Sequence, residues 1–396
     1  MRILTISTLY PNAVNPRHGI FVETRLRQLK KHYPDIRLTV IAPVPWFPFA
    51  HPMFGQYSEF TSVPLTEIRY GIQVYHPRYL VIPKIGMNLT PVTLGYTLKR
   101  QIRSMMRQGF QFDLIDGHYY FPDGVAITEA AREFNKPFTV TARGTDINLL
   151  PTFPSARKRI QEVMTASHHN LAVCDALRTA MIELGAEPDR VSTLRNGVDL
   201  DLFSFSDEYQ QQLLRKALSL PLNIPIVISV GLLVERKGHH LVIEALRQLP
   251  DALLLIAGNG PQKKALTALA KQYGVANRVR FLGRLSQKEL SGYYGAASVL
   301  TLASDREGWA NVLLESMACG TPVVATNIWG TPEVVRQPRA GTLVERNAAA
   351  IAEGIQHILD NPFPRAATRH YAEQFDWSAT SEGQYQLFNR LIRETS

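Results

Sequence analysis

Residues 299–326 read VLTLASDREGWANVLLESMACGTPVVAT and hold one strand–helix–strand unit. An apolar strand-like run ends near Ser304, and an apolar helix-like run leads into a second strand-like run, TPVVAT. Strands and helices in alternation are typical of a parallel sheet covered on both faces. Glu307 stands just before the expected helix and Glu315 one turn into it, eight positions further on. Complementing the helix dipole explains one of these acids but not the pair.

Similar units occur in two successive series along the chain. The first series of strand-like runs covers residues 1–8, 36–43, 112–118, 137–144, 168–174 and 191–197. The second series covers residues 224–231, 252–258, 279–283, 297–304, 321–326 and 340–345. We therefore predict an α/β protein with two Rossmann-like doubly wound parallel-sheet domains, over 1–195 and 196–375, and a hinge near 195–205. Ligands of such sheets bind at the carboxyl ends of the strands, and we expect the site in the cleft between the domains.

The final segment, 376–396, predicts a helix with one apolar face. Tyr385, Phe388, Leu391 and Ile392 fall at i, i+3, i+6 and i+7, which is helical spacing. Because such a face must be covered, we expect this helix to pack on the N-terminal domain.

The composition indicates a globular protein that stays in the cytoplasm. Of its 396 residues, 45% are hydrophobic and 19% charged. No stretch reaches the ~18 consecutive apolar residues of a spanning helix, and the apolar run at the N-terminus is too short for a signal peptide. Cys174 and Cys319 stand among apolar or small residues, so we expect both to be buried and reduced.

Positive charge is concentrated in the first part of the chain. The net charge is +9, and residues 1–110 hold 14 Lys and Arg against 4 Asp and Glu. Basic residues follow one another at roughly helical spacing within 94–110, at Lys99, Arg100, Arg103 and Arg107. A solvated surface would explain the charge alone, but a basic helix is also typical of an anionic membrane surface.

An aromatic stretch, PVPWFPFAHPMFGQY at 43–57, lies in the same basic part of the chain. Its prolines exclude a regular helix or a central strand. Its large apolar side chains are Trp46, Phe47, Phe49, Met53 and Phe54. We expect this loop and the basic helix to contact the anionic inner face of the plasma membrane or a lipid-linked acceptor, with core packing of the aromatics as the alternative.

Strand ends of the second domain carry residues suited to phosphate. Gly231 opens GLLVERKGHH, in which Arg236 and Lys237 precede a helix-like stretch. Gly258 opens GNGPQKK, a G-x-G turn in which Lys263 stands where a dinucleotide fingerprint has its third glycine. The fingerprint of a Rossmann cofactor is therefore incomplete.

The helix that begins near Asn311 adds a second phosphate-binding element. Unpaired backbone amides at a helix N-terminus carry roughly half a positive charge and bind phosphate oxygens. Glu315, one turn further in, is placed to accept hydrogen bonds from the diol of a ribose. Together with Arg236 and Lys237, these groups predict a site for a nucleotide diphosphate.

The same stretch, EGWANVLLESMACGTPVVAT, resembles the E-x7-E signature of family 4 glycosyltransferases, which are retaining enzymes of the GT-B fold. The landmarks HGIF, DLIDGHYYFPDG, VTARGTDIN, RNGVDLDLF, VGLLVERKG, IAGNGP, FLGRLSQKEL and GTPEVV agree with that family in order and spacing. The RGTD form and the basic N-terminal part are similar to the branch that builds teichuronic acid and exopolysaccharides. The likeness covers nearly the whole chain.

The resemblance implies roles for individual residues. Glu307 and His118 would lie beside the transferred sugar, and Lys237, with Arg236, would neutralise the leaving diphosphate. The residues implied in donor binding are Gly19, Gly231, Gly258, Gly283, Arg284, Leu285, Gly308, Trp309, Ala310, Asn311, Val312, Leu313 and Glu315. Among these, Glu315 would hold the ribose, and Gly283 to Leu285 would edge the nucleobase.

Two positions depart from the family pattern. Relatives usually carry Arg directly after the glycine of VG, where this chain has Leu232, and Arg236 is the candidate replacement. The loop after His18 has one glycine, Gly19, where many relatives have two. These departures concern the geometry of the diphosphate site.

The resemblance also implies the course of the reaction. The nucleotide diphosphate would leave from the face on which the acceptor hydroxyl attacks, so the configuration would be retained. Lysine, arginine and helix amides would stabilise the leaving group without a metal or another cofactor. The D-x-D triplet Asp199-Leu200-Asp201 falls in the predicted hinge and indicates turn chemistry.

We expect a UDP- or GDP-linked sugar as donor and a lipid-linked saccharide or polysaccharide as acceptor. A sugar-nucleotide 2-epimerase of related architecture, or a non-catalytic nucleotide-sugar-binding protein, are the alternatives. Nucleic acid is not an expected partner, because the sequence has no recognition-module signature. The pairs His168-His169 and His239-His240 lack the spacing of zinc ligands.

Overall fold

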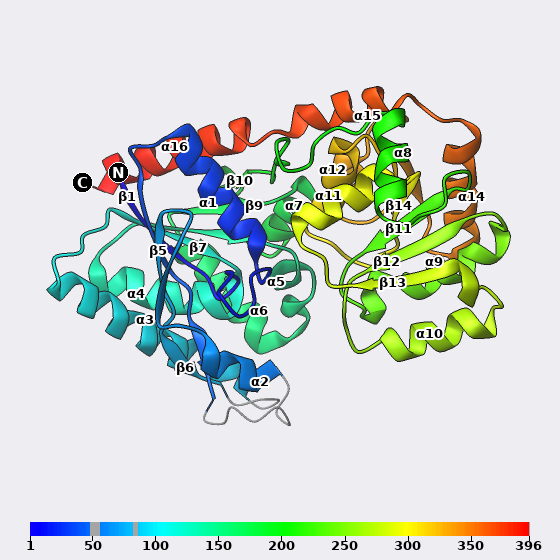
Figure 1. Ribbon diagram of the computed structural model, residues 1–396. Coiled ribbons are helices and arrows are strands. Elements are labelled where there is room, and N and C mark those ends of the chain that lie inside the picture. The colour runs from blue at the N-terminus through cyan, green and yellow to red at the C-terminus, as the bar shows by residue number, and fades with distance from the viewer. Residues whose placement is uncertain (48–55, 82–85, 396) are drawn as a thin grey trace. The chain divides into compact units, whose positions relative to one another are not determined.

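The structure is a computed structural model that describes residues 1–47, 56–81 and 86–395. The chain folds into two units (Figure 1). Unit 1 comprises Met1–Asn196 together with Trp377–Ser396, and unit 2 comprises Gly197–Asp376. Phe49, Met53 and Phe54, for which a contact with the membrane or the acceptor was predicted, lie outside the described residues.

Unit 1 is built on an eight-stranded sheet with the order β10-β9-β8-β7-β1-β2-β5-β4. All neighbouring strands are parallel except the antiparallel pair β4 and β5. Its strands are β1 (Arg2–Ile6), β2 (Arg37–Ile41), β4 (Thr66–Arg69), β5 (Ile72–Tyr75), β7 (Leu114–His118), β8 (Phe138–Ala142), β9 (His169–Ala172) and β10 (Val191–Thr193). A separate two-stranded sheet pairs β3 (Val44–Trp46) with β6 (Arg78–Leu80).

Helices cover both faces of the eight-stranded sheet (Figure 1). They are α1 (Ile20–His32), α2 (Gln56–Glu59), α3 (Thr90–Arg107), α4 (Val125–Phe134), α5 (Thr145–Asn148), α6 (Pro154–Ala166), α7 (Asp175–Glu183) and α16 (Ser378–Thr395). Strands β7, β8 and β9 are buried along their whole length, as strands of a doubly wound sheet must be.

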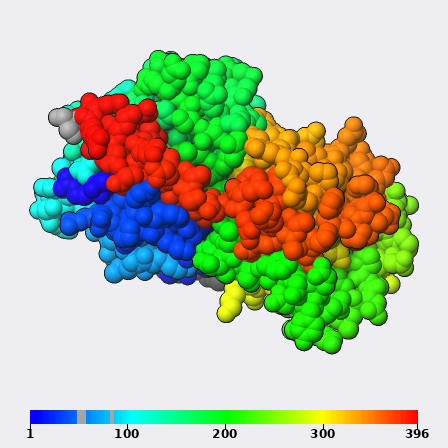
Figure 2. Space-filling model, turned by 90° about the horizontal axis from the view of Figure 1, so that it is seen from above, coloured from blue at the N-terminus to red at the C-terminus, as the bar shows by residue number. Residues whose placement is uncertain are grey.

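The C-terminal helix α16 belongs to unit 1 and runs over α1 (Figure 2). Phe388 and Leu391 are buried in the core that α1 also lines. The ring of Tyr385 stacks on that of Tyr33 with 3.9 Å between the centroids. The apolar face predicted for residues 385–392 is therefore the face that packs, and it also includes Leu387.

Unit 2 contains a six-stranded sheet with the order β13-β12-β11-β14-β15-β16, in which all neighbouring strands are parallel. Its strands are β11 (Ile226–Val230), β12 (Leu253–Ala257), β13 (Val279–Gly283), β14 (Val299–Leu302), β15 (Val323–Thr326) and β16 (Gly341–Val344). Its helices are α8 (Glu208–Ala217), α9 (His239–Ala245), α10 (Lys263–Gln272), α11 (Gln287–Ala296), α12 (Asn311–Ala318), α13 (Thr331–Val334), α14 (Ala348–Asp360) and α15 (Arg365–Ala372).

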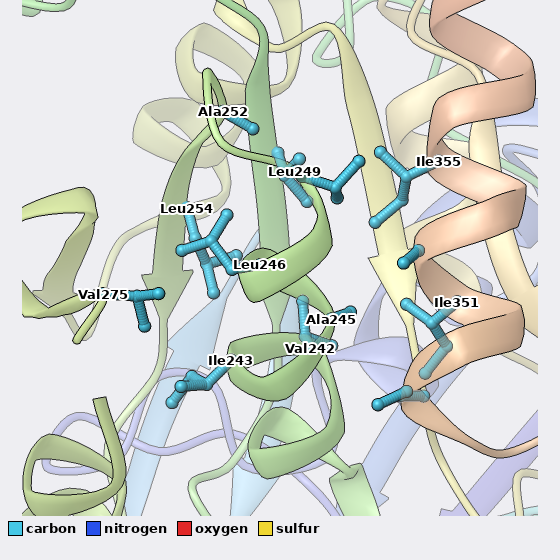
Figure 3. Close-up of a cluster of buried hydrophobic side chains, with 14 of the residues drawn as sticks. Val242, Ile243, Ala245, Leu246, Leu249, Ala252, Leu254, Val275, Ile351 and Ile355 are labelled. Atoms are coloured by element: carbon cyan, nitrogen blue, oxygen red, sulfur yellow. The ribbon is translucent and has the colours of Figure 1, made fainter. Parts of the chain in front are cut away.

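A cluster of aliphatic side chains forms one core of unit 2 (Figure 3). Val242 from α9 and Ile351 and Ile355 from α14 pack there with Leu254 from β12. Burying an aliphatic side chain of this size contributes about 1.5–3 kcal/mol. The helices are thereby held on the sheet, and the loops at its carboxyl edge remain available for a site.

All twelve predicted strand-like runs contain strands, and Cys174 and Cys319 are buried free thiols, as expected. The prediction omitted β3, β4, β5 and β6. The hairpin of β4 and β5 turns through Tyr70 and Gly71, both with positive φ (49° and 72°), and tyrosine is not a usual residue for such a turn. No helix in the described part of the chain is long and apolar enough to cross a membrane.

Candidate active site

Glycines bring three neighbouring strand ends together at the carboxyl edge of the six-stranded sheet. Gly258, after β12, has φ 152°, and a Cβ there would lie 1.8 Å from the carbonyl oxygen of Gly231, after β11. The backbone N–H of Gly258 donates to the carbonyl of Gly283, at the end of β13, at 2.8 Å. Only glycine permits this approach at residue 258, so these loops form one compact backbone surface.

The loop after β11 is also fixed to the loop after β14. A Cβ on Gly238 would lie 2.0 Å from the carbonyl oxygen of Ala303. The backbone N–H of Asp305 donates to the carbonyl of Arg236 at 2.9 Å. These contacts place Lys237 opposite Glu307, although seventy positions separate the two residues in the sequence.

Lys237 and Glu307 form an ion pair at this edge. The Lys237 Nζ donates to the Glu307 Oε1, and the Ser304 hydroxyl donates to the same oxygen at 2.7 Å. Both side chains are largely buried, with 15% and 12% of their surface exposed. Burial alone would raise the pKa of Glu307, but Lys237, Ser304 and the charge of Arg236 lower it, so the carboxylate is ionised at neutral pH.

Arg236 thus lies close enough to influence Glu307, and its half-buried side chain adjoins Lys237. Leu232, which replaces the usual arginine of relatives, is 54% exposed. The proposal that Arg236 supplies the missing charge is consistent with this proximity, because both residues belong to the same loop after β11.

The helix α12 begins at Asn311, where the sequence predicts a helix start. Trp309 is 7% exposed, and its ring lies 6.3 Å from that of Phe375. The backbone amide of Leu313 donates to the carbonyl of Ala310 at 3.0 Å, and that of Asn311 to the carbonyl of Trp309 at 3.1 Å. Two of the amides expected to face a ligand, those of Asn311 and Leu313, therefore have backbone acceptors.

Glu315 faces a tyrosine rather than a cation. The Tyr294 hydroxyl donates to the Glu315 Oε2 at 3.1 Å. Burial raises the pKa of Glu315 to about 7, against the lowering effect of this hydrogen bond. The two glutamates of the motif therefore differ in electrostatic environment, since Glu307 has a cationic partner and Glu315 has a neutral one.

The predicted nucleobase loop follows β13. Arg284 is exposed and Leu285 half-buried. Ser286 then caps α11 through a reciprocal capping box with Glu289, which fixes where the loop ends.

In unit 1, His118 ends β7 and is fully buried beside Asp116. Its Nε2 lies 3.2 Å from the Asp116 Oδ2, and its Nδ1 accepts from the Arg143 Nη2 at 2.7 Å. Burial and the charge of Arg143 lower the pKa of His118 to about 4, although Asp116 opposes this shift. The imidazole is consequently neutral at physiological pH.

Gly19 begins α1 with φ 65°, and a Cβ there would lie 2.2 Å from the Leu9 carbonyl. The loop after β1 therefore closes on itself at this glycine. His18 adds a contact between its Nε2 and the Thr8 carbonyl oxygen at 2.9 Å.

Arg143 and Asp146, which both belong to the ARGTD segment, form no ion pair with each other. The Asp146 carboxylate instead accepts from the backbone amides of Tyr120, Arg143 and Gly144 at 2.8–3.3 Å. Asp146 shapes the loop, and the Arg143 guanidinium turns toward His118. The carboxylate of Asp199 similarly accepts from the amides of Asp201 and Leu202, as in a turn.

Ser304, Tyr294 and Asp116 contact predicted site residues but were not predicted from the sequence, and neither was the buried contact between Arg25 and Gln384. Arg25 lies on the buried face of α1, and Gln384 precedes the apolar run of α16. A charged or amide residue within an apolar helical stripe was the available signal for both. Within the described residues, no group of three or more His, Cys, Asp or Glu side chains is arranged to hold a metal ion.

Comparison with known protein families agrees with this architecture. The family described as Glycosyltransferase Family 4 matches residues 22–202, and the family described as Glycosyl transferases group 1 matches residues 210–375. The chain therefore contains a Glycosyltransferase Family 4 domain followed by a group 1 glycosyltransferase domain.

Individual relatives are similar over different lengths. The chain is 29% identical over 358 residues to TuaC of Bacillus subtilis, which is named as a teichuronic acid biosynthesis glycosyltransferase; the match covers 90% of this chain and 88% of that protein. It is 33% identical over 234 residues to the D-inositol 3-phosphate glycosyltransferase of Mycobacterium tuberculosis, over 56% of this chain and 48% of that one.

Solved structures show the same fold. The sucrose-phosphate synthase of Thermosynechococcus elongatus superposes with a TM-score of 0.82 at 21% identity, over 100% of both chains. Anabaena HepE, in complex with UDP and glucose, superposes with a TM-score of 0.75 at 21% identity, over 98% of this chain and 100% of that chain. The predicted GT-B fold is confirmed by these neighbours.

Proposed function

We propose that this protein is a retaining glycosyltransferase of the hexosyltransferase type that uses a nucleotide-diphosphate sugar. The acceptor would be a lipid-linked saccharide or a polysaccharide in cell-surface polysaccharide biosynthesis. The observation that carries the proposal is the pair of Lys237 and Glu307 beside the start of α12, at the carboxyl edge of the six-stranded sheet. The name of TuaC supports the acceptor class, and the UDP and UDP-glucose held by HepE favour a UDP-linked donor.

In the proposed reaction, the diphosphate competes with Glu307 for Lys237. The ammonium then stabilises the charge that develops on the leaving phosphate, together with Arg236 and the amides before α12. Glu307 is freed to accept from hydroxyls of the transferred sugar, and Glu315 from those of the ribose. His118, neutral at physiological pH, contacts the sugar as the family resemblance implies.

The bond from the anomeric carbon to the diphosphate oxygen breaks as the acceptor oxygen attacks the same face. The acceptor hydroxyl loses its proton, and the configuration is retained. Lysine, arginine and backbone amides supply the positive charge, so we propose that no metal ion is required. Activity that persists in EDTA, and a product with the donor's anomeric configuration by NMR, are the expected results.

Replacing Glu307 with alanine tests the catalytic assignment. We expect release of nucleotide diphosphate from a panel of UDP- and GDP-sugars to fall by roughly 10²-fold or more, because both the sugar contact and the partner of Lys237 are lost. The exposed Glu353 of α14 provides the control, since Glu353→Ala should leave the rate unchanged. Transfer by Glu307→Ala at the wild-type rate would show that the assignment is wrong.

We also propose that α3 contacts the anionic inner face of the plasma membrane. Val92 and Tyr96 are 60% and 65% exposed on α3, and the exposed Arg100 follows at the same spacing. Lys99 and Arg103 instead form ion pairs with Glu129 and Glu133 of α4. Such an apolar and basic face binds anionic membranes.

Flotation with vesicles that contain phosphatidylglycerol tests this surface. We expect binding that weakens with salt and with Tyr96→Asp, and no binding to vesicles of phosphatidylcholine alone. Transfer to a short water-soluble acceptor should be unchanged in Tyr96→Asp. An absence of salt-sensitive binding would refute the membrane contact.

A further inference from the structure

Among the described residues of unit 1, one buried and one half-buried arginine form no ion pair with a carboxylate. Arg25 is 1% exposed on α1, and Arg143 is half-buried in the loop after β8. Arg25 donates to the Gln384 Oε1 and to the Leu194 carbonyl, and its Nη2 has no hydrogen-bond partner in the described part of the chain. A buried cation without a counter-ion is costly, and such groups are rare unless they have a function.

Arg143 is the more accessible of the two. Its Nη2 donates to the His118 Nδ1 at 2.7 Å and its Nη1 to the Asn196 Oδ1 at 3.3 Å. The guanidinium also lies over the ring of Phe21, 5.2 Å from its centroid. Its Nε has no hydrogen-bond partner within residues 1–47, 56–81 and 86–395. Both acceptors are neutral, and two hydrogen bonds use only part of the five N–H groups of a guanidinium.

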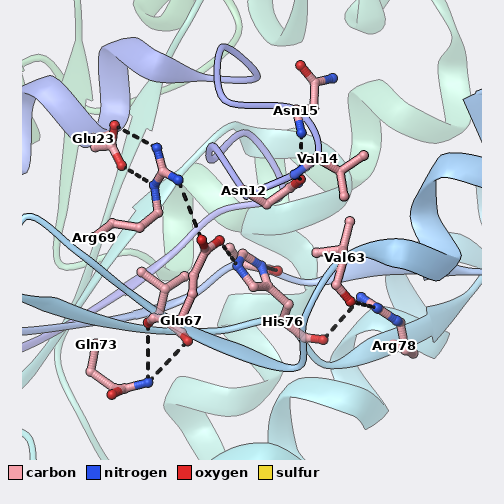
Figure 4. A network of polar contacts seen from close by, with 12 residues as sticks. Asn12, Val14, Asn15, Glu23, Val63, Glu67, Arg69, Gln73, His76 and Arg78 are labelled. Atoms are coloured by element: carbon pink, nitrogen blue, oxygen red, sulfur yellow. Dashed lines mark hydrogen bonds and ion pairs between the residues drawn. The ribbon is translucent and has the colours of Figure 1, made fainter.

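Two other arginines of the same molecule have their charge compensated, one by carboxylates and the other by several oxygen acceptors. In unit 1, Arg69 forms ion pairs with Glu23 and Glu67, and Glu67 also binds His76 (Figure 4). In unit 2, Arg365 has no such carboxylate but donates to four backbone carbonyls and to the Thr321 hydroxyl. Arg143 has neither kind of compensation.

The two acids near Arg143 do not form an ion pair with it. Asp116 lies beside His118, and its charge acts on both arginines. The carboxylate oxygens of Asp146 accept hydrogen bonds from backbone amides. Arg25 adds a second positive charge that is felt at Arg143. An anion that bound Arg143 would therefore meet the charges of two guanidinium groups, with the opposing charges of Asp116 and Asp146 nearby.

We propose that Arg143 binds a carboxylate or phosphate carried by a sugar substrate, next to His118. The planar guanidinium suits either group, because it donates two parallel hydrogen bonds to two oxygens of one oxyanion. The inference rests on the proposed function and deepens it: at least one of the two sugar substrates is anionic. Arg25 does not bind the anion itself. Its guanidinium is held in place by Gln384 of α16, and its positive charge acts on Arg143.

Binding measured by calorimetry separates the two sources of the anion. The donor arm compares UDP-glucuronate with UDP-glucose, and the acceptor arm compares glucose 6-phosphate with glucose, with and without UDP. We expect one anionic probe to bind the wild-type protein at least tenfold more tightly than its neutral counterpart. In Arg143→Gln this preference should fall to about onefold, whereas UDP alone should bind unchanged.

Two further variants keep the test decisive. Arg143→Lys retains the charge but not the paired donors, so part of the preference should remain. Arg157→Gln, at an exposed position of α6, should behave as wild type. The inference is overturned if neither anionic probe is preferred, or if the preference survives in Arg143→Gln. Failure of the proposed function would differ, because UDP itself would then not bind.

Discussion

The carboxyl edges of the two sheets differ in the partners of their basic side chains. At the edge of the six-stranded sheet, Lys237 forms an ion pair with Glu307, and the Ser304 hydroxyl donates a hydrogen bond to the same carboxylate. At the edge of the eight-stranded sheet, Arg143 donates only to neutral acceptors. Both edges arise from the same strand–loop–helix pattern, so the fold determines where a site lies and the loop residues determine what it binds. A carboxylate contacts the cation directly at the first edge, whereas at the second edge Asp116 and Asp146 act on Arg143 only through their charge.

The largest effect should follow from breaking the pair at the first edge. In Lys237→Met we expect transfer to slow by about 10²- to 10³-fold, because a preorganised cation at a developing charge is worth about 3–4 kcal/mol. The variant also leaves Glu307 buried without its cation, so the protein should lose about 3–5 kcal/mol of stability at neutral pH. Steady-state kinetics and urea denaturation measure the two effects.

The pH dependence of this loss follows from Glu307. Its pKa is lowered in the folded protein, so the stabilisation is present above the ordinary carboxyl pKa and disappears as pH falls through the folded value. The stability difference between Lys237→Met and wild type should therefore shrink in acid. Lys271→Met, at an exposed position of α10, is the matched control. Equal stability of Lys237→Met and wild type at pH 7 would remove the electrostatic contrast between the edges.

A smaller effect is expected at Glu315, which has a neutral tyrosine and not a cation as its partner. Its pKa is raised to about 7, so the folded state binds the proton more tightly than the unfolded state does. The wild-type protein is then most stable below the unfolded pKa and loses stability as pH rises toward 7. Glu315→Gln should be more stable than wild type by about 1–3 kcal/mol at pH 8, and this gain should shrink toward pH 5.

The same variant should bind UDP more weakly, because an amide replaces the carboxylate that we propose accepts from the ribose hydroxyls. Thermal melts at pH 5 and 8 and calorimetry with UDP test both statements. Glu353→Gln, at an exposed position of α14, is the matched control. A loss of stability at pH 8 would show that Glu315 is compensated by more than Tyr294.

The sequence predicts the two sheets well because each buried strand is a continuous apolar run. It also predicts the pair of Glu307 and Lys237 as members of one site, because parallel strands end at one edge and both residues follow strand ends. The β4–β5 hairpin was missed since its strands are short and its turn starts with tyrosine. Its ion pairs with α1 were equally hidden, because the register of an antiparallel edge strand depends on that turn.

The environment of Arg143 was beyond sequence reasoning for a different reason. Its neighbours come from β7 and from the segment that ends unit 1, and its electrostatic surroundings include Arg25 of α1. No local spacing encodes the convergence of such distant segments. Sequence patterns therefore located the strand-end loop, while only the packed structure revealed that its guanidinium forms no ion pair within the described residues.

The smallest effect should distinguish the second edge from the first. Replacing Arg143 with methionine removes a buried cation that has no ion-pair partner, so we expect ligand-free stability to stay unchanged or to rise by up to about 1 kcal/mol. The lost hydrogen bonds to His118 and Asn196 limit the gain. Urea denaturation of Arg143→Met, Lys237→Met and wild type in ligand-free buffer measures the contrast directly. If Arg143→Met were destabilised as much as Lys237→Met, the charge of Arg143 would be compensated within the protein, and the two edges would not differ as the structure indicates.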